Sequence, residues 1–161
     1  MRALVQRVYW AEVEVDSAVV GQVRNGLLVY AAVTPADTPA DAQAMAAKIV
    51  NLRIFTDADG KMNRTLQDVR GGILAISNFT LLADARKSRR PSFSAAAPGE
   101  QAKPIHEAFL HALRTHNVPV ATGVFGAHMT VRSAADGPVN LWLDVPDLTE
   151  ATKTTTQRTG E

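Results

Sequence analysis

Gly72-Ile73-Leu74-Ala75-Ile76-Ser77-Asn78-Phe79-Thr80-Leu81-Leu82 is the stretch on which the interpretation of this 161-residue chain depends. It begins as a short apolar run after Gly71, which predicts a buried strand. Ser77, Asn78 and Thr80 then put hydrogen-bonding side chains where a core strand would continue with Val or Ile. Burying such a group without a partner costs about 1–3 kcal/mol. Either Ser77 and Asn78 end the strand and bond to nearby backbone, or the segment forms a site.

The N-terminal part of the chain predicts strands and turns. Residues 2–24 alternate loosely between apolar and polar side chains, which indicates two strands joined by a turn at Asp16-Ser17. Asn25-Gly26 is the strongest short hairpin signal in the sequence, because both residue types tolerate positive φ. Residues 26–33 form an apolar run typical of a buried central strand. We therefore expect an antiparallel meander over the first 33 residues.

Two helices are predicted in the middle of the chain. Thr38 followed by Pro39 is typical of an N-cap with proline at the first helical position, and apolar residues recur at helical spacing over residues 42–53. A second helix is expected to begin at Pro98-Gly99-Glu100 and to carry one apolar stripe. That stripe consists of Ile105, Phe109, Ala112 and Leu113.

The C-terminal part returns to strands. They are predicted over residues 118–124, 128–132 and 139–145. Asp136-Gly137-Pro138 predicts a turn between the last two. Strands at both ends of the sequence, with two main helices between them, indicate a single α/β domain with a mixed, mostly antiparallel sheet. We expect this domain to span residues 1–146, and residues 147–161 to be a polar, flexible tail.

Composition limits the classes of protein that fit. Hydrophobic residues make up 46% and charged residues 20% of the chain, a balance typical of a globular domain. The formal net charge of +1 gives no global attraction to DNA or to a membrane surface. The absence of cysteine excludes disulfides and thiol nucleophiles. Residues 1–7 lack the apolar core of a signal peptide and no run is long enough to span a bilayer, so we expect a cytoplasmic protein without membrane partners.

Several kinds of site are not indicated by the sequence. It contains no phosphate-binding Gly-rich loop and no Gly-x-Ser-x-Gly elbow. His106 and His111 are five residues apart, about 140° around a helix, so they are poorly placed to share a metal ion. Asp57-Ala58-Asp59-Gly60 has its glycine too early for a calcium loop and predicts a tight turn. Nothing favours a Ser/His/Asp triad, and we expect no metal and no cofactor.

Three polar segments remain as candidates. Ser77-Asn78-Phe79-Thr80 could offer hydroxyls and oriented backbone N–H groups, as in an oxyanion hole. Gly137-Pro138 could offer carbonyl groups that attract an ammonium group, although such pairs are also common in plain turns. Arg86-Lys87-Ser88-Arg89-Arg90 concentrates four cations in five residues. It is either a solvated loop or the place where a polyanion binds.

Segments along the whole chain resemble the D-aminoacyl-tRNA deacylase family, and they occur in the family's order. They are Gln6-Arg7-Val8, Arg53-Ile54-Phe55 with Asp57, Gly60-Lys61-Met62-Asn63, Ser77-Asn78-Phe79-Thr80-Leu81, Arg90-Pro91-Ser92-Phe93, Gly126-Ala127-His128-Met129 and Asp136-Gly137-Pro138-Val139. The resemblance runs from about residue 1 to 145. It implies the fold of that family, in which the sheet is barrel-like.

The resemblance also implies a function. Members of the family are cytoplasmic proofreading enzymes, so this chain would hydrolyse the ester that joins a D-amino acid, or glycine, to the terminal adenosine of tRNA. The family forms homodimers with the active sites at the subunit interface. Each pocket combines the Ser-x-Phe-Thr segment of one subunit with the Gly-Pro motif of the other.

By the same analogy, each candidate residue has a role. Ser77, Asn78, Phe79 and Thr80 would form the catalytic segment. The carbonyl groups of Gly137 and Pro138 would hold the substrate's α-ammonium and exclude an L side chain. Arg7 and Met129 would fix the Gly-Pro loop. From the charge of the basic segment, and not from the resemblance, we expect the tRNA to contact Arg86, Lys87, Arg89 and Arg90.

Two mechanisms are compatible with these residues. In the first, Thr80 acts as a nucleophile or proton carrier, but the sequence supplies no obvious base to activate it. In the second, which the resemblance favours, backbone N–H groups near Phe79 and Thr80 polarise the ester carbonyl. The 2′-hydroxyl of the tRNA then assists the attacking water.

The chain departs from the family's usual pattern at four positions. It has Asn78 where Gln is usual, Val124 where Arg is usual, and Ala135 and Asn140 where Asn and Thr flank Asp-Gly-Pro-Val. These changes bear on the rate and on the geometry of the Gly-Pro loop. Two other functions therefore stay open: an RNA-binding homologue without catalysis, and an editing module that removes an L-amino acid.

Overall fold

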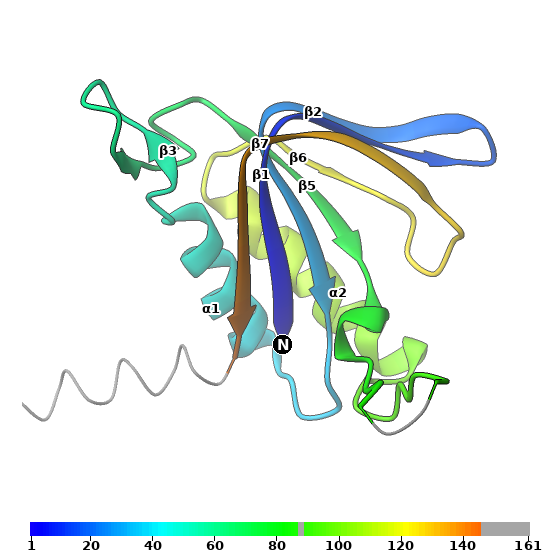
Figure 1. The fold of residues 1–161 in the computed structure, drawn as a ribbon. Coiled ribbons are helices and arrows are strands. Elements are labelled where there is room, and N and C mark those ends of the chain that lie inside the picture. Colours follow the sequence, from blue (N-terminus) through cyan, green and yellow to red (C-terminus); the bar gives the residue numbers. More distant parts are fainter. Residues whose placement is uncertain (87–88, 146–161) are drawn as a thin grey trace, which may run out of the picture.

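A five-stranded sheet in the order β6-β5-β2-β1-β7 carries two helices on one face (Figure 1). The structure is a computed structural model that describes residues 1–86 and 89–145. The predicted tail over residues 147–161 lies outside the described residues. The elements are β1 (Arg2–Val15), β2 (Ala18–Ala32), α1 (Pro39–Val50), β3 (Phe55–Thr56), β4 (Met62–Arg64), β5 (Gly72–Ser77), the 3₁₀ helix η1 (Phe79–Leu82), α2 (Gly99–Thr115), β6 (Val120–Thr122) and β7 (Thr130–Asp144).

The sheet is mixed, as predicted. β1 runs antiparallel to both β2 and β7, whereas β2–β5 and β5–β6 are parallel pairs. The long strands β1, β2 and β7 bend together, which gives the sheet its strong curvature (Figure 1). The sheet nevertheless has two edges, β6 and β7, so within one chain the barrel-like expectation applies to the curvature and not to closure.

The turn between the first two strands lies at Asp16-Ser17, where both residues have positive φ (48° and 64°). The predicted hairpin at Asn25-Gly26 is wrong, and so is the meander built on it, because β2 continues through these residues to Ala32. The physical reason is a close approach of two strands. A Cβ atom on Gly26 would lie 2.0 Å from the carbonyl oxygen of Gly72 in β5.

The turn predicted at residues 136–138 is also wrong, because β7 is one continuous strand from Thr130 to Asp144. Its pairing with β1 instead contains a large bulge. Val8 pairs with Ala135 and Gln6 pairs with Asn140, so that four residues of β7, 136–139, lie opposite the single residue Arg7. The Gly137-Pro138 peptide bond within this bulge is cis.

Both predicted helices are present. Thr38 caps α1 in a capping box with Asp41, and α2 begins at Gly99. Their apolar sides pack on the sheet and form the main core, which includes Met45, Ile49, Phe109 and Leu113. No helix in the described part of the chain is long and apolar enough to cross a membrane.

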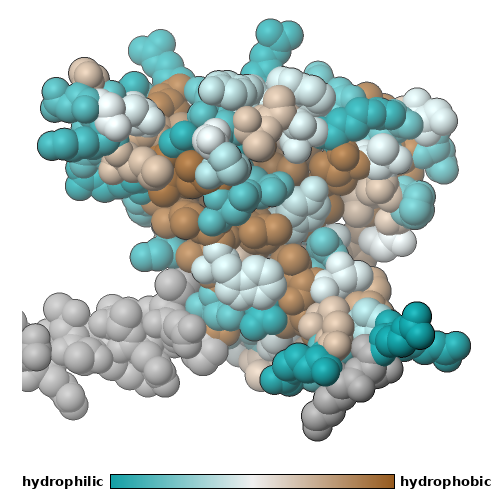
Figure 2. Space-filling model, in the orientation of Figure 1, coloured by the Kyte–Doolittle hydropathy of each residue, from teal (hydrophilic) through white to brown (hydrophobic). Residues whose placement is uncertain are grey.

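Neither of the two α-helices in the described residues covers the opposite face of the sheet. Trp142, Leu4, Tyr30 and Ile76 are neighbours across four strands on this face, because each is paired with the next in register. Trp142 at one end is 51% exposed, whereas Ile76 at the other end is buried. Figure 2 shows apolar surface gathered across the middle of the molecule in this view.

Candidate active site

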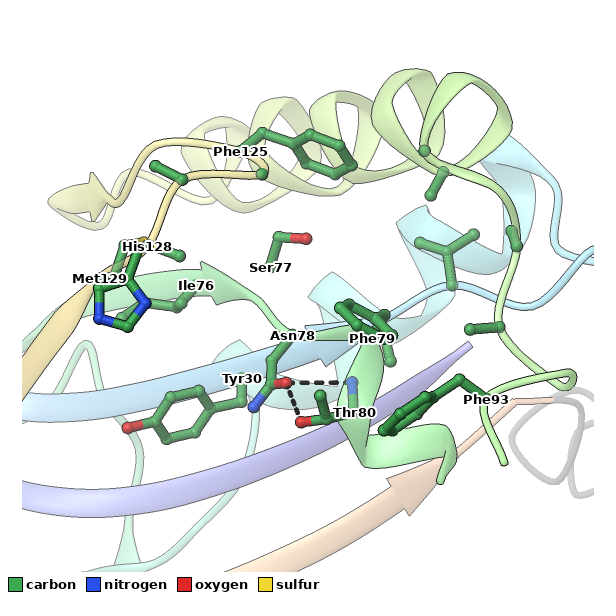
Figure 3. Close-up of a pocket in the computed structure, with 18 of the residues that line it drawn as sticks. Tyr30, Ile76, Ser77, Asn78, Phe79, Thr80, Phe93, Phe125, His128 and Met129 are labelled. Carbon is green, nitrogen blue, oxygen red and sulfur yellow. Dashed lines mark hydrogen bonds between the residues drawn. The ribbon is translucent and has the colours of Figure 1, made fainter. Parts of the chain in front are cut away.

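A pocket of about 760 Å³ lies where β5 ends and η1 begins (Figure 3). One wall is the predicted catalytic segment, residues 77–80. The opposite wall is the loop over residues 125–129, and Gly99 and Ala102 of α2 close one side. The four predicted catalytic residues therefore line a single cavity in one chain.

Asn78 shapes this wall as the N-cap of η1. Its backbone N–H donates to the carbonyl oxygen of Ala31 (2.8 Å), which continues the pairing of β5 with β2. Its side-chain Oδ1 accepts from the backbone N–H of Thr80 (3.1 Å) and from the Thr80 hydroxyl. The interpretation that Asn78 ends the strand and bonds to nearby backbone is thus correct for this residue.

Two hydrogen-bond donors remain available beside this cap. Within the described residues, neither the Ser77 hydroxyl nor the backbone N–H of Phe79 makes a hydrogen bond to the protein. Figure 3 shows the Ser77 hydroxyl pointing into the pocket, toward Phe125. Donors that face a cavity without an internal partner can stabilise negative charge on a reacting oxygen.

The geometry does not favour Thr80 as a nucleophile. Its hydroxyl donates to the amide oxygen of Asn78, which is not a base. His128 is the one imidazole that lines the pocket among the described residues, and no hydrogen bond joins it to Thr80 or Ser77. A nucleophilic hydroxyl needs a base within hydrogen-bonding reach.

In the described part of the chain, the pocket lacks the side chains that form strong ion pairs. Among the described residues that line it there is no Asp, Glu, Lys or Arg. Burial raises the pKa of the Tyr30 phenol, which keeps this hydroxyl neutral. An ammonium group entering the pocket of one chain would therefore find no carboxylate.

The Gly-Pro bulge is held by Arg7 of β1, a side chain that is only 7% exposed. Nε of Arg7 lies 3.0 Å from Oδ2 of Asp136 and 3.3 Å from the Asp136 carbonyl oxygen, and Nη1 donates to the carbonyl oxygen of Ile54. Gly137 has φ of +125°, and a Cβ atom there would lie 2.8 Å from Val139. The bulge is thus a defined structure in which position 137 requires glycine.

The structure does not bring this bulge to the pocket of the same chain. Gly137 and Pro138 are exposed and do not line the pocket. Met129, for which the resemblance implies a role in fixing the Gly-Pro loop, lines the pocket and packs against Gly123. Any meeting of the Gly-Pro carbonyls with residues 77–80 would have to occur between two copies of the chain.

The residues on either side of the basic segment are paired near the pocket. Asp84 and Ser92 exchange two backbone hydrogen bonds of 2.8 Å. Arg86 forms a fork with the Asp84 carboxylate (2.9 and 2.8 Å), and this guanidinium holds the pKa of Asp84 well below its usual range. Arg89 and Arg90 are exposed, and Lys87 lies outside the described residues.

Two further aromatic side chains of the pocket, Phe93 and Phe125, were given no role from the sequence. Phe93, which follows the basic segment, meets Phe79 edge to face with ring centroids 5.1 Å apart. Phe125 lies on the opposite wall, and His106 lies behind it with ring centroids 5.8 Å apart. Sequence patterns assign such residues to a core, because only the fold shows that they surround a cavity.

Helical periodicity did not predict that His106 of α2 is buried. It is 3% exposed, and its Nδ1 has no hydrogen-bond partner in the described structure. Burial lowers the pKa of His106 to about 4, so the imidazole is neutral at neutral pH. No group of three or more His, Cys, Asp or Glu side chains within residues 1–86 and 89–145 could hold a metal ion.

The positions that depart from the family's usual pattern have distinct surroundings. Asn140 accepts a hydrogen bond from Nε2 of Gln6 across the β1–β7 ladder (2.9 Å), so this side chain has a partner. Val124 is 45% exposed and precedes the pocket wall. Ala135 pairs with Val8 at the edge of the bulge.

Comparisons with known sequences cover almost the whole described chain. Residues 4–144 match the family described as D-Tyr-tRNA(Tyr) deacylase. A protein of Chloroflexus aurantiacus named D-aminoacyl-tRNA deacylase is 53% identical over 148 residues, which are 92% of this chain and 92% of that protein. A protein of the same name from Deinococcus deserti is 51% identical over 146 residues, which are 91% of this chain and 100% of the relative.

Two solved structures are similar in fold. The c-Myc DNA Unwinding Element Binding Protein superimposes with a TM-score of 0.85 at 37% identity, covering 91% of this chain and 99% of its own. A probable eukaryotic D-amino acid tRNA deacylase superimposes with a TM-score of 0.76, covering 89% and 98%. At 17% identity, the second similarity concerns the fold alone.

Proposed function

This chain belongs to the D-Tyr-tRNA(Tyr) deacylase family, and from this membership we propose that it hydrolyses the ester bond of D-aminoacyl-tRNA. The products are the free D-amino acid and tRNA, so the reaction removes wrongly charged tRNA before translation. The observation that carries the proposal is the unpartnered pair of donors, the Ser77 hydroxyl and the Phe79 N–H, at the wall of the pocket. Aminoacyl-tRNA is made and used in the cytoplasm, so the proposed activity belongs there.

The chemistry proposed for residues 77–80 is orientation and charge stabilisation without a protein nucleophile. The ester carbonyl accepts from the Phe79 N–H and the Ser77 hydroxyl as negative charge develops on its oxygen during attack by water. One such donor contributes about 10²–10³-fold to the rate. Asn78 holds the turn that presents these donors, and the 2′-hydroxyl of the terminal ribose assists the water.

The proposed enzyme is a homodimer in which each pocket is completed by the partner's Gly-Pro bulge. Three observations support this arrangement. Among the described residues the pocket of one chain has no carboxylate for the substrate's α-ammonium. The carbonyl groups of Gly137 and Pro138 lie on an exposed bulge, and Trp142 is 51% exposed on the sheet face away from α1 and α2. Carbonyls of a partner bulge would bind the ammonium and leave no room for an L side chain.

The tRNA is proposed to approach along the loop closed by Asp84 and Ser92. This loop carries four cations that would attract phosphates, and the attraction weakens as the salt concentration rises. They are Arg86, Lys87, Arg89 and Arg90. Phe79 and Phe93 stand exposed between this loop and the pocket. The terminal nucleotide would pass these rings on the way to residues 77–80.

The first test is deacylation of D-Tyr-tRNA and L-Tyr-tRNA by the purified protein and by a Pro138→Ala variant. We expect hydrolysis of the D-ester alone, with a lower rate or lower D/L ratio in the variant. No hydrolysis of either ester, with tRNA still bound, would replace the proposal with an RNA-binding homologue. Hydrolysis of the L-ester would indicate an editing module instead.

Mixing two impaired variants tests the shared site. Pro138→Ala alters the bulge and Asn78→Ala alters the turn, so each homodimer lacks one component in both sites. A heterodimer has one site with both components intact, and a random mixture should recover roughly a quarter of the wild-type activity. No recovery after subunit exchange would contradict the interface site while leaving the hydrolysis itself intact.

A further inference from the structure

Arg2 forms a network of contacts that no part of the proposed chemistry uses. Its Nε and Nη2 donate to the two carboxylate oxygens of Asp144 (2.7 and 3.0 Å). Its Nη1 donates to the carbonyl oxygen of Leu81 (3.2 Å), and its Cζ lies 4.7 Å from the ring centroid of Trp142. The Trp142 indole N–H in turn donates to Asp144 (3.2 Å).

This network ends on the turn that carries the candidate catalytic groups. η1 is only four residues long, and a single 3₁₀ turn has too few internal hydrogen bonds to fix its own position. Asn78 holds its N-terminal end. At its C-terminal end the Leu81 carbonyl has no partner further along the helix, and a cation there also complements the helix dipole.

The guanidinium is itself held rigidly. Asp144 lies directly opposite Arg2 in the β1–β7 ladder, so the backbone brings the two side chains together. A forked Arg–carboxylate pair restricts orientation more than a single contact does, and stacking on Trp142 restricts it further. Both side chains of the pair are only about one-third exposed, at 30% and 28%.

We propose that Arg2 is a positioning residue for hydrolysis: through the Leu81 carbonyl it fixes η1, and thereby the Phe79 N–H, at the pocket wall. The inference rests on the proposed function. Arg2 does not line the pocket, so it acts through the turn and not on the substrate. Asp144 and Trp142 serve by holding its guanidinium.

The test compares Arg2→Gln and Arg2→Lys with a matched control, Arg132→Gln. Arg132 also pairs with two carboxylates, those of Glu12 and Glu14, but it forms no hydrogen bond or ion pair with the described residues of η1. We expect Arg2→Gln to lower the single-turnover rate roughly 10- to 100-fold, as small misplacements of reacting groups do, with little change in affinity for tRNA. Arg2→Lys should not restore the rate, because an ammonium cannot make the fork.

Hydrogen exchange of the Leu81 and Ala83 amides gives a second readout that needs no activity. Both amides donate within the turn, to Asn78 and Thr80. We expect faster exchange at these two amides in both Arg2 variants and unchanged exchange in Arg132→Gln. Should Arg2→Gln fail to fold, Arg2→Lys carries the test.

The outcomes separate the two proposals. A wild-type protein inactive on every aminoacyl-tRNA removes the proposed function, and the exchange rates still report whether Arg2 fixes the turn. An active wild type with unchanged rate in Arg2→Gln overturns the positioning role, whether or not exchange is faster. Loss of rate that is equal in Arg132→Gln, or that Arg2→Lys restores, also overturns it.

Discussion

Arg7 and Asp136 form a largely buried ion pair, with Nε 3.0 Å from Oδ2, at the one position where β1 faces a four-residue bulge of β7. The contact joins two segments 129 residues apart in the chain. Arg7 also donates to the carbonyl oxygen of Ile54, at the root of the β3–β4 hairpin. One guanidinium therefore connects the bulge, β1 and the hairpin.

Replacing Arg7 with Met should destabilise the protein strongly. The change leaves Asp136 without its cation and the Ile54 carbonyl without its donor. Removing one partner of a buried pair costs about 3–5 kcal/mol; because Asp136 keeps 22% of its side chain exposed, we expect about 2–3 kcal/mol from urea unfolding. Arg53→Met, which removes an exposed arginine, should cost less than about 1 kcal/mol. Equal losses would contradict this role of Arg7.

Gly137→Ala should lower stability more than Gly60→Ala. Both glycines have positive φ, +125° and +79°, so alanine is strained at each. At Gly137 the new Cβ would also lie 2.8 Å from Val139, whereas at Gly60 nothing lies within 4 Å. We expect a loss of about 1 kcal/mol at Gly60 and at least about 2 kcal/mol at Gly137, measured by urea unfolding. Similar losses at both positions would mean that the bulge relaxes around the added methyl group.

Asn78→Ala and Asn78→Asp should differ in activity. Alanine removes the acceptor for both the Thr80 N–H and the Thr80 hydroxyl, whereas aspartate keeps it. Loss of an N-cap costs about 1 kcal/mol, and loosening the turn should lower the single-turnover rate roughly tenfold or more. Asn78→Asp should retain most of the rate. If both variants are equally slow, the rate depends on the amide N–H₂ of Asn78 and not on its role as N-cap.

His106 should make the protein less stable in acid. Burial lowers its pKa from 6.5 to about 4, so the unfolded chain binds this proton more readily than the folded one. The stabilising contribution is complete above pH 6.5 and is lost as the pH falls toward 4, on the order of 3 kcal/mol in total. In His106→Leu, unfolding measured from pH 7 to 4 should show a shallower decline. His111→Leu, at an exposed position, should decline like the wild type.

Arg86 and Arg89 should contribute to tRNA affinity in a salt-dependent way. We expect the double variant Arg86→Gln/Arg89→Gln to bind tRNA more weakly and to reduce the slope of log K against log salt by about 1–2. Arg114→Gln, an exposed change in the last turn of α2, is the control and should leave the slope unchanged. The preference for the D-ester should survive in both. An unchanged slope in the double variant would remove the loop from the binding surface.

The sequence predicted elements well where local chemistry and tertiary structure agree. Thr38 caps α1 because its hydroxyl and the Asp41 carboxylate satisfy backbone donors locally, and Asp16-Ser17 forms its turn through its own backbone preferences. Ser77 and Asn78 marked the end of β5 because polar groups cannot continue a buried strand. Each of these signals is contained within a few residues.

The errors arose where glycine serves a distant contact. Gly26 has the local signature of a hairpin, yet it permits the approach of Gly72, 46 residues later, and its strand continues straight. Gly137 likewise lies in a bulge whose partner is Arg7. A glycine needed for close backbone approach and a glycine needed for a turn look alike in sequence, because the approaching strand is not adjacent in the chain.

The site was predictable in part for the same reason. The sequence indicated segment 77–80 through its polar residues, and it indicated Arg7 through the family resemblance. The contacts of Arg2 were not, because a strand position at the start of β1 has no feature that indicates a partner at Asp144. The role assigned to each residue in catalysis stays a prediction.

The pairing of β1 with β7 determines when a newly made chain can acquire its site. The Leu81 carbonyl oxygen accepts a hydrogen bond from Arg2 of β1, and the Arg2 guanidinium is held by Asp144 at the end of β7. During synthesis the turn at residues 79–82 leaves the ribosome long before Asp144 does. A nascent chain can therefore form α1 and its local turns early, but β1 lacks its β7 partner, and Arg2 lacks the carboxylate that fixes it at η1, until β7 has emerged.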